Sequence, residues 1–144
     1  MMKKINLLVL IMSALAVFSG CKKDSTEVDK ASLITGKSWK LTAYTEGGKD
    51  ELHSTYDDCE LDDIATYFAG GKLVMNQGTI KCNNNDPQTE DLKWSIDGDK
   101  LTISQEGYAL KIEATIAELS AKTLKYSLKN PFGSETFVYT YTAQ

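Results

Sequence analysis

The stretch that decides the fold is LKWSIDGDKLTI, residues 92–103, in which apolar and polar side chains alternate on both sides of Asp97-Gly98. Alternation with a period of two is typical of strands that bury one face. An Asp-Gly pair between two such runs is a strong signal for a tight hairpin turn. The segment therefore predicts an antiparallel β-hairpin with a single apolar face.

The same alternation continues through most of the chain, and no run between the alternating segments has the periodicity of a helix. About eight antiparallel strands, each with one apolar face, must close or stack to bury that face, and closure also removes exposed edges. The sequence therefore predicts an all-β, up-and-down antiparallel barrel, with an open sandwich as the alternative. The other alternating runs are 39–43, 64–68, 73–75, 108–116, 124–128 and 137–141, preceded by a single helical turn at 31–34.

The N-terminus has the pattern of a lipoprotein signal peptide. Lys3 and Lys4 precede an apolar run over 5–18, which ends on Ser19-Gly20-Cys21. A basic start, a short apolar segment and small residues before a cut site are typical of secretion signals. A bilayer span would need roughly 20 apolar residues. We expect cleavage before Cys21 and lipidation of its thiol, with a plain signal peptide cut elsewhere as the alternative.

These features divide the chain into a signal peptide over 1–20, a polar flexible tether over 21–30 and a barrel domain over 31–144. The expected location is the bacterial cell envelope, as an outer-membrane lipoprotein that faces the periplasm or the cell surface. Loss of Lys3 and Lys4 with the signal changes the formal net charge from −4 to −6, and the chain contains no arginine. Nucleic-acid binding is therefore not expected, because it requires a basic patch.

The two cysteines that remain after lipidation are Cys59 and Cys82. In an exported chain an even number of cysteines suggests a disulfide. A zinc site is the alternative, but two thiols with a single histidine do not supply four ligands. If Gly70-Gly71 forms a hairpin turn that pairs Phe68 with Leu73, the same register extended outward places the two cysteines opposite each other. We expect a Cys59–Cys82 disulfide at one rim of the barrel.

The polar residues form no catalytic constellation. The acidic stretch 56–63 has calcium binding as its functional alternative, but its spacing fits no EF-hand loop and we expect it to be solvated. His53 lies in a polar loop without a serine–histidine–acid pattern. The sequence therefore predicts no catalytic residue, no metal site, no cofactor and no enzymatic activity.

Aromatic and soft side chains on the predicted inward face either fill the barrel or line a cavity. Barrels of about eight strands lie at the size where both outcomes occur. Buried tyrosines would favour a cavity, because each hydroxyl requires a partner. The candidate cavity-lining residues are Trp39, Phe68, Met75, Trp94, Tyr108, Tyr126, Phe137 and Tyr139.

Several short motifs resemble lipocalin-like domain lipoproteins of Bacteroidetes-type bacteria. Gly36-Lys37-Ser38-Trp39 looks like a lengthened form of the glycine-x-tryptophan start of lipocalins, and Cys59-Glu60-Leu61-Asp62-Asp63 is followed by a Gly-Gly turn. Lys81-Cys82-Asn83 and Trp94-Ser95-Ile96 add to the likeness. The resemblance implies a calycin-type barrel, an outer-membrane anchor and a hydrophobic ligand. Lys22-Lys23-Asp24 is similar to the signal that sends such lipoproteins to the cell surface.

The sequence thus predicts a lipid-anchored barrel that binds a small hydrophobic ligand, either a fatty or an aromatic molecule. The alternative is a filled-core barrel that acts as a protein-interaction or structural module of the envelope. The membrane, through the lipid, and a small ligand are the expected partners, and no oligomeric state is indicated. The long connections around 45–61 and 76–90 would lie at the same end of the barrel, and we place the mouth there.

Overall fold

A computed structural model describes residues 29–109 and 111–144 of the chain; the expected signal peptide, Cys21 and most of the tether lie outside this part. The chain forms short helices and strands in the following order. They are α1 (Lys30–Ile34), β1 (Ser38–Glu46), β2 (Lys49–Asp50), α2 (Leu52–Thr55), α3 (Asp58–Leu61), β3 (Ile64–Tyr67), β4 (Lys72–Asn76), β5 (Thr89–Asp97), β6 (Lys100–Ser104), β7 (Lys111–Leu119), β8 (Thr123–Lys129) and β9 (Thr136–Ala143).

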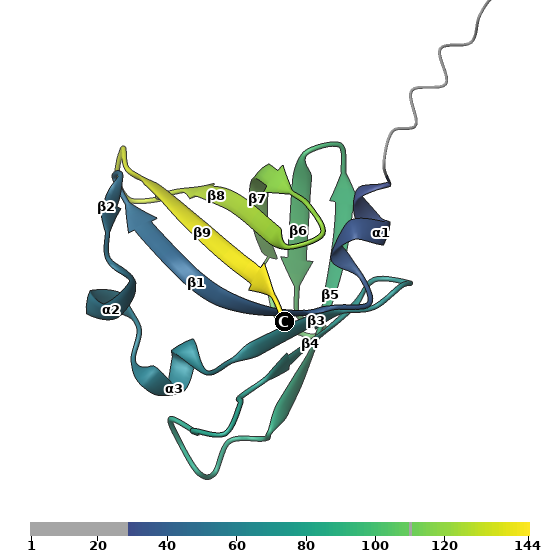
Figure 1. Ribbon diagram of the computed structural model, residues 1–144, viewed down its shortest axis with the longest axis vertical. Helices are drawn as coiled ribbons and strands as arrows, with labels where there is room; N and C mark the ends of the chain where they lie inside the picture. The colour runs from purple at the N-terminus through teal and green to yellow at the C-terminus, as the bar shows by residue number, and fades with distance from the viewer. Residues whose placement is uncertain (1–28, 110) are drawn as a thin grey trace, which may run out of the picture.

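Eight of the strands close into an antiparallel up-and-down barrel (Figure 1). Neighbours in sequence pair from β3 to β9, and β1 closes the cylinder by pairing with β3 on one side and β9 on the other. β2 forms a small hairpin on the end of β1. The β5–β6 hairpin turns at Gly98-Asp99, with Asp97 opposite Lys100 and Trp94 opposite Ile103. The predicted barrel is confirmed, and the open sandwich is wrong.

One end of the barrel is closed by α1 and a fully buried tryptophan. The side chains of Ile34 and Trp39 have no exposed surface, and the Trp39 Nε1–H donates to the Ile34 carbonyl oxygen at 2.8 Å. The Asp29 carboxylate caps α1 by accepting from the Ala31 N–H. Leu101 and Leu124 complete this layer, also without exposed surface. The closed end also contains the β5–β6 and β7–β8 turns.

The β3–β4 hairpin is shifted by one residue from the expected register. Tyr67 pairs with Leu73 and Ala65 with Met75, so Tyr67 is inward and Phe68 is 46% exposed. Gly70 and Gly71 both adopt positive φ and belong to a longer turn, in which the Phe68 N–H donates to the Lys72 carbonyl. A one-residue shift reverses which face each side chain occupies. The prediction that Phe68 lines the interior is therefore wrong.

A β-bulge on β1 causes a second departure from the expected alternation. The β1–β9 register shifts between Leu41 and Ala43. Beyond the bulge Tyr44, rather than Ala43, is buried and lies opposite Tyr139. An added residue on one strand re-aims every side chain that follows it.

Tyr108 is also not an interior residue. It lies in the β6–β7 turn, where its N–H donates to the Gln105 carbonyl, and its side chain is 68% exposed. The following strand begins at Lys111, after Gly107 has turned the chain with a positive φ. The alternating pattern thus extended beyond the strand, and the prediction that Tyr108 lines the cavity is wrong.

The helical turn predicted at 31–34 corresponds to α1, whereas α2 and α3 were not predicted. Each of these two helices has four residues, which is too short to show a periodicity. Across the described residues, no helix has the length and apolar character needed to cross a membrane.

We predict that Trp39→Phe lowers the free energy of unfolding by about 1–3 kcal/mol, because it leaves the buried Ile34 carbonyl without a donor. Urea unfolding measures the change. Phe132→Ala is the control: Phe132 is 98% exposed, so its replacement should change stability by less than about 0.5 kcal/mol. An equal effect of the two substitutions would contradict the role given to the Trp39–Ile34 bond.

Candidate functional site

The inward faces of the strands differ in exposure between the two ends of the barrel. At the closed end Trp39, Leu101 and Leu124 are fully buried, whereas Ile96, Leu119 and Ala143 there are half-buried. Toward the opposite, open end the inward residues are only half-buried, although they point to the barrel axis. This half-buried group consists of Met75, Ile103, Ile112, Leu128, Phe137 and Tyr139. Solvent therefore reaches the interior from the open end, and the packed core occupies mainly the closed half.

Tyrosines line the boundary between these two halves. Tyr126 stacks on Tyr139 and Tyr141 at ring-centroid distances of 5.3 and 5.7 Å, and Tyr44 lies 5.0 Å from Tyr139. The Tyr126 hydroxyl lies 3.4 Å from that of Tyr141. Burial raises the pKa of Tyr126 and of Tyr141, so these hydroxyls stay protonated at neutral pH and can donate hydrogen bonds.

Tyr67 brings a further hydroxyl to this cluster. Its side chain is 3% exposed, and its ring stands edge-on to Trp94 at 5.4 Å. Burial raises the pKa of Tyr67, and the neighbouring Tyr141 adds to the effect. The indole N–H of Trp94 does not take part in this cluster, because it donates to the Phe68 and Lys72 carbonyls at 3.1 and 3.0 Å.

Asp63 places a carboxylate beside these hydroxyls. It immediately precedes β3, and strand alternation puts it on the same face as the buried Ala65 and Tyr67. Its Oδ1 atom is buried without a hydrogen-bond partner among the described residues. Burial raises the pKa of the Asp63 carboxyl, and the negative charges of Glu60 and Asp62 raise it further. An unsatisfied buried acceptor costs stability, which marks Asp63 as a residue suited to meeting a ligand.

A pocket of about 220 Å³ opens beside Asp63 at the rim of the barrel. We call it the mouth pocket. Its lining combines apolar and sulfur groups with carboxylates from three segments of the chain. The lining residues are Cys59, Asp63, Met75, Gln77, Cys82, Asp86 and Glu90.

A disulfide and a set of hydrogen bonds to Asp62 hold the loops around the mouth pocket in place. The Cys59–Cys82 disulfide links α3 to the β4–β5 loop with a Cα–Cα distance of 5.2 Å. The Asp62 carboxylate accepts hydrogen bonds from the N–H of Thr79 and, at 2.8 Å, from the N–H of Ile80. These bonds lower the pKa of Asp62. The disulfide prediction is confirmed, but neither cysteine lies in a strand ladder, so the register argument that paired them is wrong.

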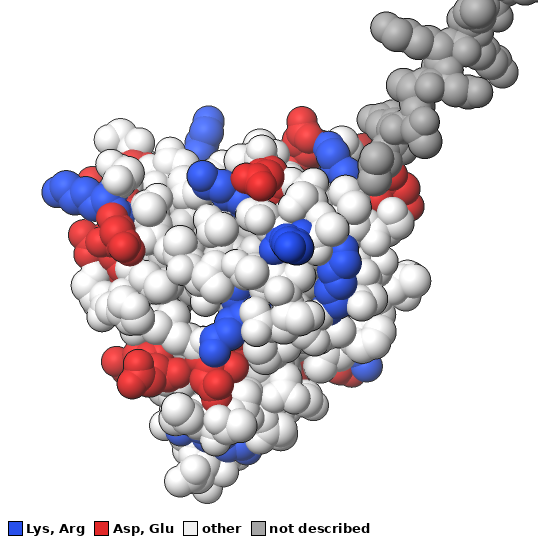
Figure 2. Space-filling view, in the orientation of Figure 1, with Lys and Arg blue, Asp and Glu red and all other residues white. Residues whose placement is uncertain are grey.

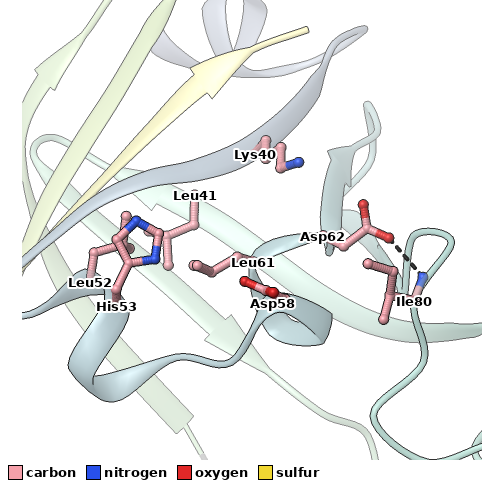
Figure 3. Close-up of a pocket in the computed structure, with 8 residues that line it drawn as sticks. All are labelled: Lys40, Leu41, Leu52, His53, Asp58, Leu61, Asp62 and Ile80. Atoms are coloured by element: carbon pink, nitrogen blue, oxygen red, sulfur yellow. Dashed lines mark hydrogen bonds between the residues drawn. The ribbon is translucent and has the colours of Figure 1, made fainter.

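A second hollow of about 400 Å³ lies beside the part of β1 that has no partner in β3 (Figure 3). Leu41 on β1 and Leu61 on α3 point toward one another across it, and His53 lies on α2 at its edge. Lys40, Leu52, Asp58, Asp62 and Ile80 complete its lining. The hydroxyls and the unpaired carboxylate oxygen converge inside the barrel rather than here, so we take the barrel mouth as the candidate site.

The structure places the remaining predicted cavity residues at different depths. Trp39, Trp94 and Tyr126 are buried in the core, whereas Met75, Phe137 and Tyr139 are half-buried toward the mouth. Sequence reasoning missed Tyr44, Tyr67 and Asp63, because a bulge and a register shift hid the first two. Asp63 gave no signal beyond its place in an acidic run.

The acidic stretch 56–63 lies over α3, where acids gather on the face shown in Figure 2. In residues 29–109 and 111–144, no three His, Cys, Asp or Glu side chains group in a way that could hold a metal ion. The carboxylates of this region are therefore available for hydrogen bonds and for charge interactions with organic groups.

Comparison with known proteins agrees with this geometry. Residues 34–126 match the family model of the lipocalin-like domain, so the chain belongs to the lipocalin-like domain family. The structure is similar to that of a lipocalin-like protein from Bacteroides uniformis, with 13% sequence identity and a TM-score of 0.47, over 74% of this chain and 96% of that one. No curated protein matches the chain.

We predict opposite effects for the neighbouring substitutions Asp63→Asn and Asp62→Asn. The pKa of Asp63 is raised in the folded state above its ordinary value of 3.8. Between pH 3.8 and this raised pKa, the folded state therefore binds more protons than the unfolded state. The contribution of Asp63 to stability falls as pH rises through this range. Asp63→Asn should therefore stabilise the protein at pH 7, with a gain that fades on acidification to pH 3.8.

The sign is reversed for Asp62, whose pKa is lowered in the folded state. Its contribution to stability is present above pH 3.8 and is lost as pH falls through the lowered value. Asp62→Asn should therefore destabilise the protein at pH 7. Urea unfolding at several pH values measures both effects, and a loss of stability at pH 7 in both variants would contradict the assignment for Asp63.

Proposed function

We propose that this protein is a lipid-anchored envelope lipoprotein whose barrel binds a small, mainly hydrophobic molecule at its open end. The observation that carries the proposal is the partial exposure of inward apolar side chains there, next to a packed closed half. Concave apolar sites with a few placed polar groups are typical of small-molecule binding. The lipocalin-like family supports a binding or structural role for the barrel, and the proposed role is binding rather than catalysis.

We predict that a neutral apolar dye, N-phenyl-1-naphthylamine, binds saturably with an increase in its fluorescence. Ile112→Trp should abolish this binding, because Ile112 points inward at the open end and is half-buried, so a larger side chain fills the space. The control is Thr115→Trp, which adds the same side chain on the exposed outer face of β7 and should leave binding unchanged.

The alternative function, a filled barrel that acts as an interaction or structural module, gives a different result. The dye would then show no saturable binding. Ile112→Trp would also cost about 1–3 kcal/mol of stability, as overpacking a filled core does. This pair of results would overturn the ligand-binding proposal.

The proposed anchor rests on the N-terminal sequence and on Cys21. We predict that the wild-type protein fractionates with the outer membrane and that its N-terminus carries the mass of acyl chains. Cys21→Ala should lose both properties while the barrel still folds, and Ser25→Ala should retain them. Wild-type protein that is soluble and carries no acyl mass would contradict the lipoprotein assignment.

A further inference from the structure

We propose that the ligand joins an apolar or aromatic body to a positively charged amine, and that Asp63 receives the amine inside the barrel mouth. This inference rests on the proposed ligand-binding function and adds the chemical class of the ligand. Three features of the described residues support it: the sign of the charges around the interior, the polar atoms left without partners, and the aromatic faces beside them.

The charged side chains on the inward face of the open end are acids. Glu46 on β1 lies opposite Phe137, and Glu90 on β5 lies opposite Met75; both partners are inward residues. Asp63 extends the inward face of β3. The lysines of the described barrel strands alternate with inward apolar residues and point outward, as Lys125 does between Leu124 and Tyr126. Such a one-sided charge distribution favours a cation.

The polar atoms at this site include an acceptor that lacks a donor. Oδ1 of Asp63 is buried and unpaired among residues 29–109 and 111–144. Beside it, the Tyr141 hydroxyl accepts from that of Tyr126, and the charge of Asp63 raises the Tyr141 pKa. The almost fully buried Tyr67 brings another phenol oxygen close to Tyr141. An ammonium group carries up to three donors, and the carboxylate and the phenol oxygens are its natural acceptors.

Aromatic rings surround these oxygens. The faces of Tyr126, Tyr139 and Tyr141 stack in a row, and Tyr44 and Tyr56 meet edge-to-face at 5.4 Å beyond them. Tyrosine faces attract cations through the ring quadrupole, and aromatic cages with a nearby carboxylate suit alkylammonium groups. The same rings pack against the apolar body of a ligand.

This arrangement disfavours the fatty acids expected from the sequence. A carboxylate ligand would meet the like charges of Asp63 and Glu90, and no inward lysine of the described strands would offset them. A bare metal ion is also a poor fit, because no set of three ligating side chains is present among the described residues.

Three matched indole compounds test the inference by isothermal titration calorimetry. They are tryptamine, which is cationic, tryptophol, which is neutral, and indole-3-acetate, which is anionic. We expect tryptamine to bind about tenfold more tightly than tryptophol, because it adds a charge-assisted hydrogen bond, and indole-3-acetate to bind most weakly.

Asp63→Asn should remove the preference for tryptamine over tryptophol. The control is Asp97→Asn, which makes the same change of net charge at the closed end and should keep the preference. Glu90→Gln provides a second variant that should reduce the preference, and it tests the site independently of Asp63→Asn.

The outcomes separate this inference from the proposed function. Equal binding of the three indoles, or binding of the neutral dye without binding of tryptamine, overturns the amine assignment and leaves the proposed function standing. Absence of binding by the dye and by all three indoles overturns both. A preference for tryptamine that survives in both Asp63→Asn and Glu90→Gln overturns the assignment of the site.

Discussion

The pairing of β1 with β9 is the constraint on which the rest of the barrel depends. Seven residue pairs join these strands, from Trp39–Ala143 to Glu46–Phe137, whereas three pairs join β1 to β3. Closure removes the sheet edges that would otherwise be exposed. It also bends β1 through its bulge, turns Tyr44 inward and leaves part of β1 facing α2 and α3. The β1–β9 pairing therefore determines both the closure of the barrel and which part of β1 faces α2 and α3.

The closed end of the barrel interior contributes more to the stability of the fold than the mouth does. At the closed end Trp39 and Ile34 bury their surfaces and satisfy their hydrogen bonds. Toward the mouth, hydroxyls face one another at 3.4–3.5 Å, and the Asp63 carboxylate has an oxygen without a partner among the described residues. Polar groups held in place at a cost in stability are common where a protein meets a ligand. In the neighbouring Asp62, Oδ2 accepts from the backbone N–H groups of Thr79 and Ile80, so the same residue type there stabilises the loop.

Much of the fold could be predicted from the sequence, because alternation and turn residues act locally. The Asp97-Gly98 hairpin, the barrel and the disulfide between Cys59 and Cys82 follow from such local or compositional signals. The tyrosine site could not be predicted in the same way. Its members depend on the bulge near Thr42 and on a turn one residue longer than Gly70-Gly71 alone would make, and both are set by packing between strands distant in sequence. Tyr108 shows the opposite error, since alternation there continued into a turn.

The position of α1 determines which end of the barrel is next to the N-terminal part of the chain. The described chain begins at Asp29, directly before α1 at the closed end, and Figure 1 shows α1 on the side away from α3 and the β4–β5 loop. Residues of α3 and of this loop line the mouth pocket. If Cys21 carries a lipid as proposed, the membrane anchor precedes α1 in the chain and joins the barrel at its closed end. A barrel attached by its base presents its opening to the aqueous side, away from the bilayer. Its cargo would then be collected from water and not from the membrane's own lipids, which suits an amphiphilic amine better than an insoluble acyl chain.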